Sequence, residues 1–458
     1  MASDLVSLVE LPRDEAFAIT ADFVADTHPQ KVSLGAGVYR DENSKPWVLP
    51  SVKEAFSTLD HEYLPIHGSD PFLTAARDLI LGQDQEQDQG QENNVISIQT
   101  ISGTGANHLG AAFLAETLHP KPTHVFISDP TWSNHHLIWE VAAPHVLRRT
   151  YPYYDPSSRS LDFDGMISTL ESEAVENDVV MLHACAHNPT GIDPSPEQWR
   201  AIAELVRRKR LFPLFDAAYQ GFASGDLDRD AWAVRYFRKA LFGTTTATTA
   251  AAAAAAQEDG RAGRDLWGPQ GMGIAQSFAK NFGLYGERVG AFHLVLPPPP
   301  HPISSSTCSP LPSPTPFGTG SPGARSHLLR LVRASISNAP QFGSRIVALI
   351  LSDTELTAMW KADLRTMSGR IKRMRLLLRD AIEKHGSSSV GDWCHLEAQI
   401  GMFSYTGLGE DHVRRLREVH HVYLMRSGRA SLCGVTESNV EYVAGAIAEV
   451  VRYYRVEK

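Results

Sequence analysis

The chain has 458 residues, 43% of them hydrophobic and 21% charged, which is enough for two domains with ordinary buried cores. A formal net charge of -9 argues against sequence-independent binding to nucleic acid, and no apolar run is long enough to span a membrane. The four cysteines are too sparse for a disulfide framework, and the N-terminus resembles neither a secretory signal nor a transit peptide. We therefore expect a cytoplasmic protein without nucleic-acid or membrane partners.

Glycine turns lie near the N-terminus and again after the first long predicted strand. Gly35 and Gly37 suit either a simple turn or a close approach of the backbone to a ligand. Residues 95–101 alternate as a strand and lead through Ser102-Gly-Thr-Gly-Ala106 into an apolar helical pattern. Free N–H groups at a helix start favour an anion, whereas His108 breaks the dinucleotide pattern G-x-G-x-x-G. The segment therefore predicts a cradle for a single phosphate.

The middle of the chain alternates strands, turns and helices, which predicts an open, mostly parallel α/β sheet flanked by helices. The candidate strands are residues 123–128, 179–185, 211–215 and 273–278. Such sheets bind their ligands beyond the carboxyl ends of the strands. Five polar or aromatic residues follow predicted strand ends: Thr104, Trp132, Asn188, Asp216 and Lys280. We therefore expect these five residues to meet at one rim of the sheet.

Three of these residues leave a structural and a functional interpretation open. Trp132 suits a core position or a stacking surface for a planar ring. Asp216 after an apolar strand needs a partner, either a backbone N–H or a cation such as a protonated ring nitrogen. Lys280 lies between Phe278 and Phe282, where partial desolvation favours the free amine that Schiff-base chemistry requires.

Two local motifs lead to structural predictions. His183 and His187 have the i,i+4 spacing of a zinc site but follow a strand and lack the Glu of H-E-x-x-H, so no metal site is predicted. Ser195-Pro-Glu-Gln198 predicts a helix that begins with a capping box, and Trp199 begins its buried face.

Two low-complexity insertions interrupt the chain, at about 243–268 and 297–323, and are expected to be surface loops or disordered. The C-terminal part predicts a helix at 367–384 and three strands, at 399–404, 421–425 and 427–433. Arg429 in the last strand requires a carboxylate, either from the protein or from a substrate. We expect a large cofactor-binding domain of residues 47–364 and a smaller α/β domain of residues 1–46 and 365–458.

Four long stretches follow one known pattern. They are Met181-Leu-His-Ala-Cys-Ala-His-Asn-Pro-Thr-Gly191, Phe215-Asp-Ala-Ala-Tyr-Gln-Gly-Phe-Ala-Ser-Gly225, Asp230-Ala-Trp-Ala-Val-Arg-Tyr236 and Ser277-Phe-Ala-Lys-Asn-Phe-Gly-Leu-Tyr-Gly-Glu-Arg-Val-Gly290. These stretches resemble the aspartate aminotransferase family of fold type I pyridoxal-phosphate enzymes. The resemblance implies pyridoxal 5'-phosphate as cofactor and amino-group transfer from L-aspartate to 2-oxoglutarate. It also implies a homodimer with shared active sites.

The resemblance further implies a role for each candidate residue around the cofactor ring. Lys280 would bind the cofactor covalently and then move the substrate proton. Asp216 would pair with the ring nitrogen, and His135 would support Asp216 from behind. The remaining ring contacts would come from Asn188 and Tyr219 at the phenolic oxygen and from Trp132 stacked on the ring.

The phosphate and the substrate would have their own residues. By resemblance the phosphate would be held by Ser102, Gly103, Thr104, Ser277 and Arg288, with Tyr63 reaching in from a second subunit. Arg429 would bind the substrate α-carboxylate, helped by Gly37, Trp132 and Asn188. Arg333 would read the distal carboxylate across the dimer interface.

Departures from the family pattern leave other activities open. Ile336 replaces an aromatic residue, and Ala339 replaces one of two prolines near the substrate. One alternative is therefore a broad-specificity or aromatic aminotransferase. The other is a catalytically impaired dimeric interaction protein, disturbed by the two insertions.

Overall fold

The computed structural model describes residues 15–35, 39–43, 47, 49–54, 63–82, 94–243, 268–297, 321–386 and 392–456. The chain divides into two compact units. The larger unit consists of Val48–Asn188 and Ile192–Gly369, and the smaller unit of Met1–Trp47, Pro189–Gly191 and Arg370–Lys458. Most of both low-complexity insertions, and Gly37, lie outside the described residues.

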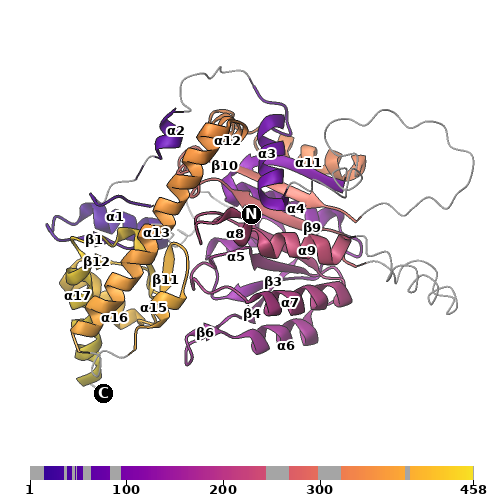
Figure 1. Ribbon diagram of the computed structural model, residues 1–458. Helices are drawn as coiled ribbons and strands as arrows, with labels where there is room; N and C mark the ends of the chain where they lie inside the picture. The colour runs from indigo at the N-terminus through magenta and orange to yellow at the C-terminus, as the bar shows by residue number, and fades with distance from the viewer. Residues whose placement is uncertain are drawn as a thin grey trace, which may run out of the picture. The chain divides into compact units, whose positions relative to one another are not determined.

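A seven-stranded mixed sheet forms the centre of the larger unit (Figure 1). In spatial order its strands are β2 (Val95–Ile101), β10 (Val289–Val295), β9 (Met272–Ser277), β8 (Phe212–Ala217), β7 (Val179–His183), β3 (His124–Asp129) and β4 (Leu147–Pro152). Strand β10 runs antiparallel to both β2 and β9, and the other pairs are parallel. The predicted mostly parallel sheet is therefore confirmed.

Helices cover both faces of this sheet. One face carries α6 (Phe163–Glu173), α7 (Pro196–Lys209) and α9 (Trp232–Phe242), which Figure 1 draws one below another. The other face carries α4 (Ser102–Thr117), α5 (Asn134–Ala142) and α11 (Pro322–Ser335). Successive strand residues alternate between the two cores, as Leu214 and Phe215 do, so strands buried on both faces read as continuous apolar runs.

Helix α7 begins with the predicted capping box. The Ser195 hydroxyl accepts the Gln198 N–H (3.3 Å), and Gln198 Oε1 accepts the Ser195 N–H (2.8 Å). Pro196 occupies the first turn, where its missing N–H costs nothing. The predicted buried face is also confirmed, because Trp199 and Ile202 pack into the core.

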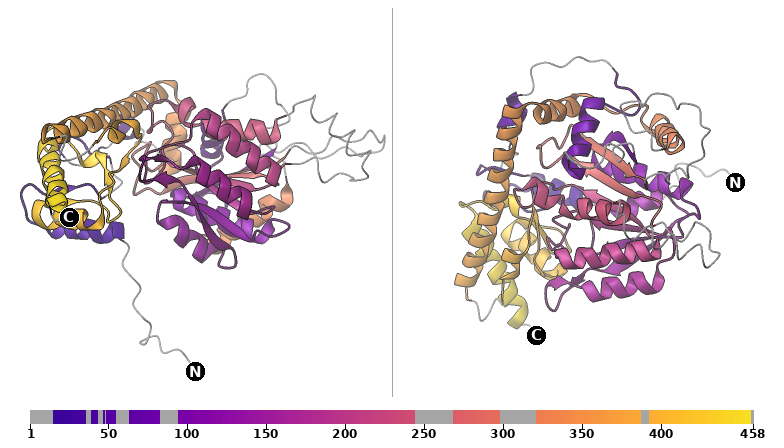
Figure 2. Two further views of the ribbon diagram at one scale, coloured as in Figure 1. Left: turned by 90° about the horizontal axis from the view of Figure 1, so that it is seen from below. Right: turned by 45° about the vertical axis from the view of Figure 1, so that its right-hand side comes forward.

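Further helices complete the larger unit. They are α2 (Pro50–Glu54), α3 (Asp70–Leu81), α8 (Leu227–Asp230), α12 (Phe342–Ser352) and the first part of α13 (Thr354–Lys384). Helix α13 is one helix of 31 residues that continues from the larger unit into the smaller (Figure 2). The helix predicted at 367–384 is thus only its second half. No described helix is long and apolar enough to cross a membrane.

The smaller unit contains two short sheets. Strand β1 (Val32–Ser33) pairs in parallel with β12 (Val422–Tyr423), and β11 (Phe403–Tyr405) pairs antiparallel with β13 (Arg429–Ser431). Its helices besides the end of α13 are α1 (Glu15–Ala25), α15 (His395–Ala398), α16 (Glu410–His420) and α17 (Val440–Val456).

The three strands predicted for the smaller unit are shorter than expected. Glycines with positive φ interrupt the extended backbone at Gly401 (77°) and Gly428 (81°). Ile400 donates its N–H to the Gly191 carbonyl and not to a neighbouring strand. The segment Leu432–Gly434 forms a 3-10 turn, so the predicted strand at 427–433 ends at Ser431.

Candidate active site

The parallel strands of the larger unit deliver the predicted site residues at one rim. Ser102 begins α4 directly after β2, and Ser277 ends β9 three residues before Lys280. Lys280 Nζ lies 5.3 Å from the centre of the Tyr219 ring, which follows β8. Asp216 is inside β8 and not after it, because the strand continues to Ala217.

Asp216 is a buried carboxylate held by two side chains. His135 Nε2 lies 2.9 Å from Asp216 Oδ2, and Asn107 Nδ2 donates to the same oxygen at 3.3 Å. Within the described part of the chain, the partners of this carboxylate are therefore two side chains. Burial by itself raises the pKa of Asp216, but the hydrogen bond from His135 and the positive charge of Lys280 lower the pKa below its usual value. The carboxylate is thus ionised and ready to accept a cationic N–H.

A network of hydroxyl and imidazole groups orients His135. Because ionised Asp216 only accepts hydrogen bonds, His135 Nε2 carries the hydrogen of that contact. Thr131 Oγ1 lies 2.9 Å from His135 Nδ1 and 3.3 Å from His183 Nε2. Burial lowers the pKa of His183 to about 3 and that of His187 well below its usual value, so both rings are neutral. Ring nitrogens of both histidines contact protein groups, and Ser128 Oγ lies 2.9 Å from His187 Nε2.

The start of α4 forms a cradle whose donors fit a phosphate. Among the described residues, no side chain caps the first turn of the helix, and the N–H groups of a helix start are suited to bind an anion. Ser102 Oγ lies 3.3 Å from Ser277 Oγ, and Arg288 O accepts the Ser102 N–H at 3.1 Å. A Cβ on Gly103 would lie 3.0 Å from the Ser277 Cβ, so a larger residue there would force Ser277 to shift by a few tenths of an ångström. Hydroxyls and helix N–H groups suit a phosphate, and the Arg288 guanidinium donates from Nη1 to the Tyr285 carbonyl at 3.0 Å.

Trp132 and Asn188 lie beside the histidine network. The Trp132 ring packs edge-on against His135 with ring centres 5.2 Å apart, and the side chain is half-buried. Asn188 is buried and donates its N–H to His183 Nδ1 at 3.4 Å. Both residues therefore lie close to the imidazoles behind Asp216.

Two predicted residues lie on the surface of the single chain. The Tyr63 side chain is 90% exposed. Arg333, in the last turn of α11, is exposed, and its Nη1 donates to the Ser337 hydroxyl. Exposure in one chain is what a role across a dimer interface requires.

Arg429 belongs to the smaller unit. It is buried in β13, its Nη2 donates to the Gly35 carbonyl at 3.1 Å, and its guanidinium lies 4.2 Å from the centre of the Phe403 ring. Gly35 is therefore a close backbone neighbour of this arginine. The other glycine predicted for this turn, Gly37, lies outside the described residues.

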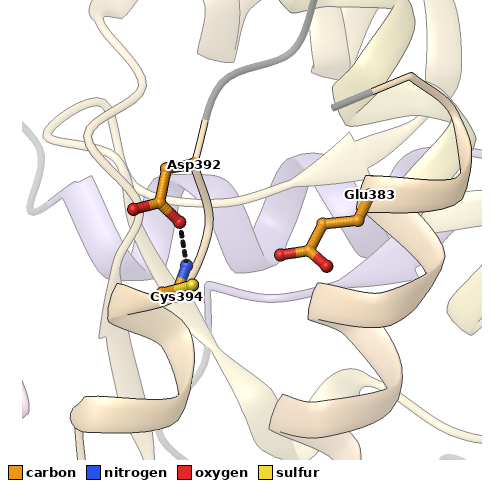
Figure 3. Close-up of side chains that lie close together, drawn as sticks. All are labelled: Glu383, Asp392 and Cys394. Carbon is orange, nitrogen blue, oxygen red and sulfur yellow. Dashed lines mark hydrogen bonds between the residues drawn. The ribbon is translucent and has the colours of Figure 1, made fainter. Parts of the chain in front are cut away.

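One cluster among the described residues could hold a metal ion by distance alone. The ligand atoms of Glu383, Asp392 and Cys394 lie within 4.8 Å of one another in the smaller unit (Figure 3). Asp392 accepts the Cys394 N–H at 2.8 Å, and its hydrogen bond and charge raise the pKa of the Cys394 thiol. The cluster is largely exposed and the thiol protonated, so we assign no metal to it.

Asn107 and Thr131 are the contacts that sequence reasoning missed. Asn107 comes one helical turn after Gly103 and thus on the same side of α4, which is a signal that the sequence carried. Thr131 is one residue before Trp132, and no spacing pattern singled it out.

Comparison with known proteins gives full-length similarities. A family model described as "Aminotransferase class I and II" matches residues 29–447. The L-tyrosine:2-oxoglutarate aminotransferase of Aspergillus ustus is 43% identical over 98% of this chain and 78% of its own. The cytoplasmic aspartate aminotransferase of Saccharomyces cerevisiae is 42% identical over 100% of this chain and 99% of its own.

Solved structures agree in fold. Aspartate aminotransferase from the S. cerevisiae cytoplasm matches with a TM-score of 0.84 and 41% identity, covering 99% of this chain and 100% of the other. The aromatic-amino-acid aminotransferase of Burkholderia pseudomallei, covalently bound to pyridoxal phosphate, matches with a TM-score of 0.80 and 35% identity, covering 98% and 100%.

Proposed function

The chain belongs to the class I and II aminotransferase family, and from this premise we propose that it is an aspartate aminotransferase. It transfers the amino group of L-aspartate reversibly to 2-oxoglutarate, giving oxaloacetate and L-glutamate. The observation that carries the proposal is the buried, ionised Asp216 at the same rim as Lys280 and the phosphate cradle. The name of the yeast relative supports a cytoplasmic location.

The proposed cofactor is pyridoxal 5'-phosphate, which the B. pseudomallei neighbour binds covalently. When bound, it supplies an aldehyde that condenses with amines and a protonated ring that delocalises the electrons of a broken Cα–H bond. The donor set at the start of α4 supports this assignment. There Ser102, Gly103, Thr104, Ser277 and Arg288 would hold the phosphate.

Each residue near the ring has a separate task in this proposal. Ionised Asp216 would accept the ring N–H and keep the ring nitrogen protonated, while His135 holds the carboxylate in place. Asn188 and Tyr219 would donate hydrogen bonds to the phenolic oxygen, and Trp132 would stack on the ring.

Lys280 acts first as a nucleophile and then as a base. Its amine would hold the cofactor covalently. Once displaced by the substrate amine, the Lys280 amine would be the base that moves the proton of the substrate Cα. Lys280 is half-buried, and its Nζ lies 5.3 Å from the centre of the Tyr219 ring.

Two arginines are proposed to select dicarboxylic substrates. Arg429 would bind the α-carboxylate and Arg333 the distal one, each with the two parallel hydrogen bonds that a guanidinium offers. The proposal includes a homodimer, with Tyr63 and Arg333 contributed to the partner's site.

The test is a comparison of amino donors with the purified enzyme loaded with pyridoxal phosphate. We expect kcat/KM for L-aspartate to exceed that for L-tyrosine or L-phenylalanine by at least about tenfold, because a second ion pair binds only the dicarboxylate. Faster turnover of the aromatic donors would contradict the assignment to aspartate.

A second candidate, an aromatic or broad-specificity aminotransferase, is favoured by two observations. The A. ustus relative is named for L-tyrosine, and Ile336 lies beside Ser337, the hydrogen-bond partner of Arg333. A third candidate, a catalytically impaired homologue, predicts a colourless protein that does not bind added pyridoxal phosphate.

A further inference from the structure

We propose that Asn107 is a positioning residue of this active site, which fixes the Asp216 carboxylate and ties it to the phosphate-binding turn of α4. The inference rests on the proposed function, because it assigns Asp216 to the cofactor ring. Asn107 is fully buried in α4, on a helix whose other buried residues are small or apolar apart from Ser102. Burying an amide at such a position costs desolvation free energy, which hydrogen bonds to the amide must offset.

The side-chain amide of Asn107 bridges two groups of the site. Its Nδ2 donates to the Gly103 carbonyl at 3.0 Å and to Asp216 Oδ2 at 3.3 Å. Both partners are acceptors only, so the amide cannot be flipped without placing Oδ1 against two oxygens. The Nδ2 end of the Asn107 amide therefore faces Asp216 and Gly103.

The other end of the amide supports this reading. Asn107 Oδ1 is buried and has no hydrogen-bond partner among the described residues. A buried acceptor without a donor is unfavourable, and an apolar residue of similar size would avoid it. We therefore attribute the asparagine at this position to the hydrogen bonds that its Nδ2 donates to Asp216 and Gly103.

The two protein donors meet at the same carboxylate oxygen. His135 Nε2 and Asn107 Nδ2 both contact Asp216 Oδ2, one from α5 and one from α4. These two hydrogen bonds hold Oδ2 from two helices and would leave Oδ1 to accept the ring N–H. Two donors also favour the ionised carboxylate, which in turn keeps the ring nitrogen protonated.

The bond to Gly103 adds a link to the phosphate. Gly103 packs against Ser277 in the cradle, so Asn107 contacts the turn that binds the phosphate and the acid that binds the ring. The residues proposed for the two ends of the cofactor are thereby linked through the Asn107 side chain. Losing Asn107 should affect both.

The experiment compares Asn107→Leu with the wild-type enzyme, and Asn177→Gly serves as a matched control. Asn177 is also buried in the larger unit, and its Nδ2 donates to the Pro120 carbonyl at 3.0 Å. Its φ of 67° is one that glycine adopts freely, so the control removes a buried amide without backbone strain. Three quantities are measured: the affinity of the apoenzyme for pyridoxal phosphate, the pH midpoint of the bound cofactor's absorption, and the melting temperature of the apoenzyme.

For Asn107→Leu we expect about tenfold weaker cofactor binding, because one charge-assisted hydrogen bond is lost. The pH midpoint should shift to higher pH, since a less protonated ring nitrogen withdraws fewer electrons from the covalent bond to Lys280. We expect kcat to fall more than KM changes. The Asn177→Gly control should lower the melting temperature and leave the midpoint in place.

Wild-type affinity and midpoint in Asn107→Leu would overturn the inference, and so would a lower melting temperature with an unchanged midpoint. If the leucine variant does not fold, Asn107→Asp keeps the size and polarity. Its carboxylate would lie beside Asp216, so cofactor affinity should fall as pH rises, and pH-independent affinity would overturn the inference. A wild-type protein that binds no pyridoxal phosphate contradicts the proposed function itself.

Discussion

At the scale of single residues, the proposed chemistry depends on an amine and a carboxylate of opposite character. Lys280 is only half-buried and lies over the Tyr219 ring, whereas Asp216 is buried and ionised. The proposed roles require the Lys280 amine to move and the Asp216 carboxylate to stay fixed. The hydrogen bonds to Asp216 Oδ2 explain how the carboxylate is kept in place.

Lys280→Ala is expected to remove both the covalent bond to the cofactor and the base. Transamination should fall by more than about a thousandfold, since covalent and proton-transfer catalysis are lost together. The measurements are the transamination rate with aspartate and the absorption band of the lysine-bound cofactor. Lys361→Ala, on the exposed surface of α13, is the matched control and should retain both. Activity that survives in Lys280→Ala would contradict the mechanism.

At the scale of elements, the start of α4 has little freedom because Gly103 packs on Ser277. Gly103→Ala should weaken cofactor binding, since the new methyl group would lie 3.0 Å from the Ser277 Cβ and displace one donor of the cradle. Titration of the apoenzyme with pyridoxal phosphate measures the effect. Gly369→Ala in α13 is the control, because a Cβ there meets no atom within 4 Å. That control should leave cofactor affinity unchanged and raise the free energy of unfolding by about 0.5–1 kcal/mol.

Asp230, the last residue of α8, carries a carboxyl group whose titration should be visible in the stability of the protein. Asp230 Oδ2 accepts the N–H groups of Gly221 (2.8 Å) and Ser224 (3.2 Å), and burial raises its pKa from 3.8 to about 6. The folded state thus holds the proton more tightly than the unfolded state. This contribution to stability is complete below pH 3.8 and lost as the pH rises through 6.

Asp230→Asn has no such proton, and its amide oxygen can still accept the two N–H groups. Between about pH 4 and 6 the wild type should therefore lose stability relative to Asp230→Asn, on the order of 3 kcal/mol. Urea unfolding of both proteins across this range measures the difference. Parallel pH dependences would show that Asp230 does not titrate as described.

Local patterns predicted the elements that local interactions determine. Strand β2 was predicted at its observed bounds of 95–101, and the capping box of α7 is present, because each depends on residues close in sequence. The short strands of the smaller unit were predicted too long, since positive-φ glycines such as Gly428 end them. Asn107 was missed because its contact with Asp216 joins residues 109 positions apart.

At the scale of the whole molecule, the proposed dimer makes each active site a joint product of two chains. If Arg333 acts in the partner's site, then Lys280→Ala and Arg333→Leu inactivate different halves of one site. Mixing the two inactive variants should restore about a quarter of wild-type activity, because half of the dimers are hybrid and each hybrid has one intact site. The rate with aspartate after co-refolding is the measurement.

Mixing Lys280→Ala with Asp216→Asn is the control and should restore no activity, since both residues belong to the half of the site that one chain supplies. No recovery in the first mixture would contradict the shared site.

The roles assigned to Gly37, Tyr63, Arg333 and Arg429 stay predictions. Tyr63 and Arg333 were identified only through resemblance, and for Gly37 and Arg429 the residues themselves left a structural interpretation open, because substrate and partner chain supply the contacts that define these roles. The residues at the rim of the larger sheet could be predicted more directly, since strand ends in a parallel sheet share one edge.

The antiparallel pairing of β10 with β9 separates Lys280 from the two insertions. Strands β9 and β10 form a hairpin, and Lys280 lies in the connection that follows Ser277. The insertions join the chain at the opposite end, before Met272 and after Val295, which pair with each other. Roughly 17 Å of strand lies between that end and the lysine side of the hairpin. The chain can therefore gain or lose length at these two junctions during evolution while the lysine keeps its place.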